Sequence, residues 1–104
     1  MYYGPVTLGS TIPLFEQVTN GSGVPSNADT NSVSYAIYGP SASSPLLSGT
    51  FGATVVNSQT GFYAAPSVAF TAGNGFLADN TYIIRTTFAV SSVNQVRIHT
   101  ITVV

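Results

Sequence analysis

Few side chains in this sequence could catalyse a reaction or bind a metal. The histidine and acidic residues are His99, Glu16, Asp29 and Asp79, and cysteine is absent. A zinc or calcium site needs several such ligands to converge. A nucleophilic triad would need His99 beside one of the acids and an activated serine or threonine, but no nucleophile-elbow motif accompanies them. We therefore expect no catalytic residues, no metal site and no cofactor.

Charge is scarce along the whole chain. Charged residues make up 5% of the sequence, against about 25% in an ordinary soluble domain. The basic residues are Arg85 and Arg97, with no lysine, so the sequence predicts no nucleic-acid partner and no binding to a lipid surface. A nearly neutral surface has little repulsion to keep copies apart. This favours a protein that works within an assembly, although adhesin-like domains are also rich in serine and threonine.

The N-terminus, MYYGPVTLGS, has neither the cationic nor the apolar region of a secretory signal. No apolar run approaches the roughly 20 residues of a membrane span, so we expect a soluble chain made in the cytoplasm. Tyr2, Tyr3 and Pro5 form a candidate partner-contact arm, because tyrosine supplies a large contact area at low entropic cost. The alternative is that the two tyrosines pack on their own domain.

Alternation of apolar and polar residues predicts strands and no helix. The clearest strand runs from residue 82 to 90, with its even positions apolar, and a turn at 91–94 leads to a second strand over 95–104. Shorter strands are expected at the following ranges: 12–18, 33–37, 46–48, 51–56 and 62–70, the last with Pro66 at an edge or bulge. About seven strands separated by Gly, Pro, Asn and Ser predict an all-β antiparallel sandwich.

Asp79 lies in the segment GNGFLADNTYIIR, just before the longest predicted strand. A tyrosine that opens a strand after a short turn, as Tyr82 does, matches the tyrosine corner of immunoglobulin-like sandwiches. Asx side chains commonly bond to the backbone of their own turn. We therefore expect Asp79 to cap the turn and Tyr82 to bond back to it, which makes both residues structural.

Three stretches resemble a recurring immunoglobulin-like pattern in virion structural proteins of tailed bacteriophages. They read GSGVPSNADTNSVSYAIYG, PLLSGTF and NSQTGFYAAPSVAFTAGNGFLADNTYIIRTTFAV. The positions that carry the resemblance are Gly23, Pro25 and Asp29, then Leu46, Leu47, Gly49 and Thr50, then Thr60 to Tyr63, and finally Gly75, Phe76, Ala78 and Asn80 to Tyr82. The resemblance covers about residues 12 to 104.

The resemblance implies a virion protein without enzymatic activity, and specifically a capsid decoration or cement protein. Such a protein is synthesised in the host cytoplasm, binds the outer surface of the major capsid protein lattice, and forms a homo-oligomer on it. The domain expected is an immunoglobulin-like sandwich over 12–104, preceded by an arm or first short strand at 1–11. Members of this group often carry more charge in the strands after the corner, so the partner face is not located by the resemblance. The alternative is a receptor- or glycan-binding module of a tail or neck component.

Overall fold

The computed structural model describes all 104 residues and contains seven strands, two short 3₁₀ helices and no α-helix. The strands are β1 (Tyr2–Val6), β2 (Ser10–Gln17), β3 (Ser34–Tyr38), β4 (Pro45–Thr50), β5 (Phe62–Phe70), β6 (Asn80–Val90) and β7 (Val93–Val103). The 3₁₀ helices span Val56–Ser58 and Ala72–Asn74. The all-β sandwich predicted from the sequence is confirmed.

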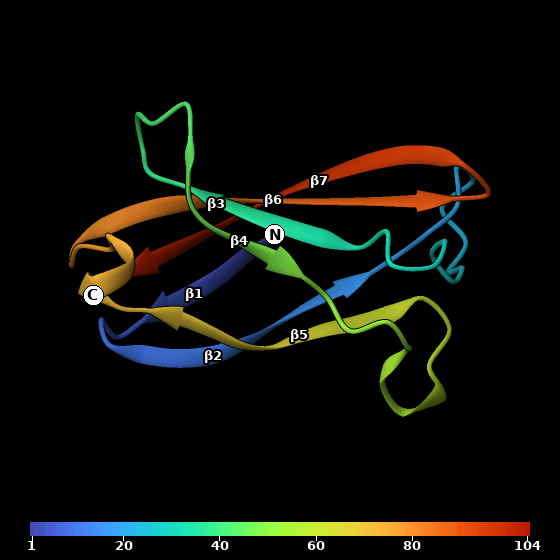
Figure 1. The fold of residues 1–104 in the computed structure, drawn as a ribbon, viewed down its shortest axis with the longest axis horizontal. Helices are drawn as coiled ribbons and strands as arrows, with labels where there is room; N and C mark the ends of the chain where they lie inside the picture. The colour runs from blue at the N-terminus through green and yellow to red at the C-terminus, as the bar shows by residue number, and fades with distance from the viewer.

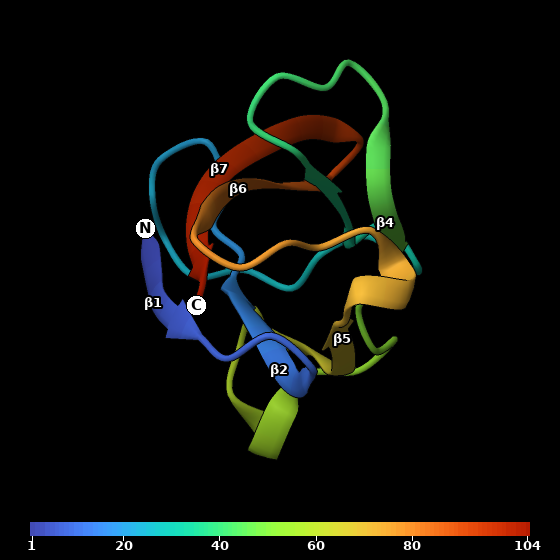
Figure 2. The same ribbon diagram turned by 90° about the vertical axis from the view of Figure 1, so that its left-hand side faces the viewer.

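The strands form two packed sheets. Five strands make the larger sheet in the order β1-β7-β6-β3-β4, and β2 pairs with β5 in the smaller one. All pairs are antiparallel except β1 with β7, which run parallel. Figure 1 shows β6 and β3 above the ribbon of β2 and β5, and the end-on view in Figure 2 separates the two layers. Sixteen buried apolar residues fill the space between the sheets.

The β6–β7 hairpin forms the centre of the larger sheet. The even-numbered residues from Tyr82 to Phe88 in β6 are buried, as the alternation predicted. The turn is shorter than expected: it consists of Ser91 and Ser92 alone, since Val90 already pairs with Val93. Their φ angles of 49° and 65° are those of a type I′ turn, which matches the twist of a hairpin but normally favours Asn and Gly.

Asp29 stabilises this unusual turn from a distant part of the chain. Its two carboxylate oxygens accept hydrogen bonds from the backbone N–H groups of Ser91, at 3.0 Å, and Ser92, at 2.8 Å. Its own N–H donates to the carbonyl oxygen of Ala89. The long loop before β3 is thereby tied to the end of the β6–β7 hairpin, which gives two serines a conformation they rarely adopt.

The separate strand predicted at 51–56 is wrong. The chain leaves the larger sheet after β4, because Phe51 is buried and the N–H of Gly52 bonds to the carbonyl oxygen of Ala64 in β5. That crossing from one sheet to the other prevents a continuous ladder. The bulge expected at Pro66 is present, and it lies where the β2–β5 register shifts between the pairs Ile12–Val68 and Leu14–Ala65.

Candidate functional site

The turn before β6 is held by Tyr82. Its buried hydroxyl accepts a 2.8 Å hydrogen bond from the N–H of Leu77. The side-chain cap expected from Asp79 is not formed. Asp79 instead adopts a left-handed φ of 68° and uses its N–H to bond the carbonyl oxygen of Val103, so its carboxylate stays exposed. Asp is one of the few residues that tolerates this backbone conformation, which explains its place here without a side-chain bond.

The N-terminal residues do not form a free arm in the structure. They belong to β1, an edge strand of the larger sheet, where Tyr2 pairs with Thr100. Tyr3 points inward, and its hydroxyl donates a 2.5 Å hydrogen bond to the carbonyl oxygen of Phe15 in β2. Tyr2 and Pro5 are exposed and Tyr3 is half-buried, so Tyr2 and Pro5 are the more accessible of the three expected contact residues.

A buried polar cluster links the two sheets, and sequence reasoning did not anticipate it. Glu16 and His99 are 4% and 5% exposed, and His99 Nε2 lies 2.6 Å from Glu16 Oε1. Arg97 Nη1 lies 3.8 Å from the other carboxylate oxygen, and Arg97 Nη2 bonds the hydroxyl of Thr19 at 2.6 Å. The ring of Tyr3 packs edge-on against His99. Alternation could have shown that each residue lies on a buried face, Glu16 with Leu14 and His99 with Ile101, but not that the two side chains meet.

The geometry of this cluster is that of a group of side chains that stabilises the fold. Burial, followed by the nearby Glu16 carboxylate, raises the pKa of Tyr3 to about 12, so its phenol remains a neutral donor. His99 Nδ1 is buried without a hydrogen-bond partner, and no group of three or more metal-ligating side chains occurs anywhere in the chain. The cluster joins β2 of the smaller sheet to β7 of the larger one, and removing one partner of such a buried ionisable pair is strongly destabilising.

The solvent-facing side of the larger sheet, here called the outer face, is almost free of charge. Strand pairing places its residues in rows: Tyr2, Thr100, Ile83 and Tyr38; then Ile98, Arg85, Ala36 and Ser48; then Val96, Thr87, Ser34 and Thr50. Arg85 is the single charged side chain in these rows. The branched aliphatic members are well exposed, with Ile83 at 38%, Val96 at 49% and Ile98 at 55%.

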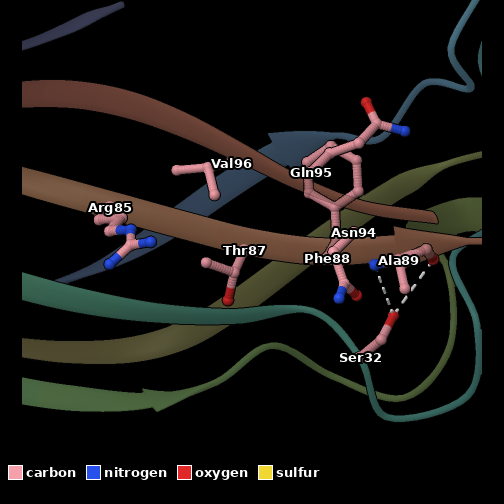
Figure 3. A pocket seen from close by; sticks show the side chains of 8 residues that line it. All are labelled: Ser32, Arg85, Thr87, Phe88, Ala89, Asn94, Gln95 and Val96. Atoms are coloured by element: carbon pink, nitrogen blue, oxygen red, sulfur yellow. Dashed lines mark hydrogen bonds between the residues drawn. The ribbon is translucent and has the colours of Figure 1, made fainter. Parts of the chain in front are cut away.

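Two shallow depressions of the outer face meet at Arg85 and Thr87, which line both. One extends toward Asn94 and Val96 near the hairpin, and Figure 3 shows Arg85, Thr87 and Val96 side by side there. The other extends over β3 and β4. Among the residues drawn in Figure 3, the marked hydrogen bonds join Ser32 to Ala89, and none reaches Arg85.

Comparison of the chain with protein-family models, with curated proteins and with solved structures gives no match. The structure contains no helix long and apolar enough to cross a membrane.

Proposed function

We propose that this protein is a non-enzymatic structural component of a phage virion, a decoration protein that binds the assembled major capsid lattice through its outer face. The observation that carries the proposal is the outer face itself. An exposed sheet surface that combines aliphatic side chains, hydroxyls and one charge is typical of a surface that becomes covered.

The arrangement of strands supports an immunoglobulin-like domain, the fold that the phage resemblance implies. Strands β7, β6 and β3 lie in the order of the G, F and C strands of such domains, and β4 extends the sheet as a further strand does in the variable type. The corner tyrosine, Tyr82, is the third residue of β6, the strand that follows the turn at Asp79, and its hydroxyl bonds to the backbone five residues earlier.

A decoration protein stabilises a shell because it binds the assembled state and not the free subunits. At a free concentration 100 times its dissociation constant, each occupied site contributes about 2.7 kcal/mol to the assembled state. Small neutral domains can occupy every site of a lattice without mutual repulsion. A scarcity of charge that would be a liability in a free monomer is therefore compatible with this role.

Cosedimentation with purified capsid shells of the phage that encodes the chain tests the proposal. We expect saturable binding at a fixed number of copies per capsid subunit, a preference for expanded over precursor shells, and a higher shell melting temperature. Absence of binding to either shell would overturn the proposal. Retention of the protein on host cell-surface glycan in the same preparation would then favour the adhesion module.

A further inference from the structure

Arg85 is a cation without a partner inside its own chain. It takes part in neither ion pair of the structure, since both of these involve Glu16. Arg97, by contrast, is bonded to Thr19 and lies 5.5 Å from the ring centre of Phe88. The two arginines therefore have different roles: Arg97 joins the sheets, whereas Arg85 is presented to solvent.

The surroundings of Arg85 determine what a partner must provide. Its cross-strand neighbours are Ala36 on one side and Ile98 on the other, so neither can compensate its charge. Covering this surface would remove water from the guanidinium, and a desolvated charge is costly unless it is paired and hydrogen-bonded. The planar guanidinium donates two parallel hydrogen bonds to a carboxylate, which makes an acidic side chain the fitting complement.

A second copy of this chain is poorly suited to supply a carboxylate to Arg85. Two-fold pairing of outer faces would use the same patch twice, and the rows of that patch contain no acidic side chain to pair with Arg85. Glu16 is buried and Asp29 is bound to the hairpin turn. Asp79 alone has a free, exposed carboxylate, and it lies in the turn before β6, outside the outer face.

We infer that the outer face docks on a partner protein that inserts an Asp or Glu side chain, within otherwise uncharged surroundings, against Arg85. The depressions on either side of Arg85 receive the partner's flanking residues. The hydroxyl of Thr87, which also lines both depressions, is already bonded to that of Ser34 at 2.8 Å, so Arg85 is the group that selects the acidic side chain. This inference rests on the proposed function, because it assigns the contact between the decoration domain and the major capsid protein.

The test compares binding of Arg85 variants to expanded shells by cosedimentation. Arg85→Gln is expected to weaken binding at least about tenfold, because truncating a buried, hydrogen-bonded charge pair is costly at an interface. Arg85→Lys keeps the charge but loses the two-bond geometry, so its binding should fall between Gln and the parent. Arg85→Glu should bind more weakly still, and an acidic-to-arginine change at one position of the capsid protein should restore it.

Asp79→Asn provides the control, since it removes an exposed charge that lies outside the outer face. Its binding to shells should equal that of the parent, and melting temperatures should show that all variants fold. Equal binding of the parent and Arg85→Gln would overturn the inference while leaving decoration intact. Failure of the parent itself to bind would overturn both. Loss of binding in Asp79→Asn together with loss of self-association would also overturn the inference, because a second copy would then supply the carboxylate.

Discussion

Asp29→Ala should destabilise the protein although Asp29 lies in a loop. The substitution removes both acceptors of the Ser91 and Ser92 N–H groups. Hydrogen bonds to a charged group contribute about 1.5 to 3 kcal/mol when well buried. The half-buried position of Asp29 lets water replace part of this, so we expect roughly 1 kcal/mol per bond and about 2 kcal/mol in total. A domain of this size should then melt about 8 to 16 °C lower.

The assay is chemical denaturation followed by circular dichroism, with Asp29→Asn and Asp79→Asn as matched variants. Both remove one negative charge, but only Asp29→Asn loses a turn acceptor, so it should cost about 1 kcal/mol and Asp79→Asn less than about 0.5 kcal/mol. Replacing Ser91 by Asn and Ser92 by Gly favours the type I′ turn intrinsically, and should reduce the effect of Asp29→Ala. Equal stability of Asp29→Asn and Asp79→Asn would refute the reasoning.

Three further predictions concern the core and the sheet contacts. Gly61→Ala should destabilise by about 3 kcal/mol or more in the same assay, because a Cβ there would lie 2.5 Å from a backbone oxygen at a φ of +74°; an effect below about 1 kcal/mol would contradict this packing. Tyr82→Phe should cost about 1 to 2 kcal/mol, since it leaves the Leu77 N–H without its acceptor, and unchanged stability would argue against the corner. Because the pKa of Tyr3 is raised from 10.0 to about 12, folding stability should decline as pH rises through this interval. Glu16→Gln should lower that pKa in a tyrosinate absorbance titration, and an unchanged titration would show that the carboxylate does not act on Tyr3.

Alternation and turn residues were sufficient to predict most of the architecture. The even positions of β6 gave its buried face, and Tyr82 marked the turn that precedes it, because these signals depend on local sequence alone. The extra strand at 51–56 failed for a tertiary reason. Phe51 satisfies strand propensity but is used where the chain crosses between sheets, and propensity yields to such contacts.

The interactions that sequence reasoning missed all join distant segments. Asp29 bonds a turn more than sixty residues away, and Glu16 meets His99 across the sandwich. Spacing along the chain carries no information on such pairs. The outer face could not be identified from the sequence for a related reason. Val96 and Ile98 have the residue types of a core, but the structure buries His99 and Ile101, so the odd-numbered side of β7 faces inward.

Site-specific labelling tests the central claim most directly, namely that the outer face is the surface that becomes covered. The chain contains no cysteine, so Val96→Cys on the outer face and Thr11→Cys on β2 of the smaller sheet each provide a unique attachment point for a spin label. Both positions are exposed in the free protein. On addition of expanded shells, the label at residue 96 should lose mobility and access to a water-soluble relaxation agent, while the label at residue 11 stays unchanged. Protection at residue 11 with continued access at residue 96 would contradict docking through the outer face.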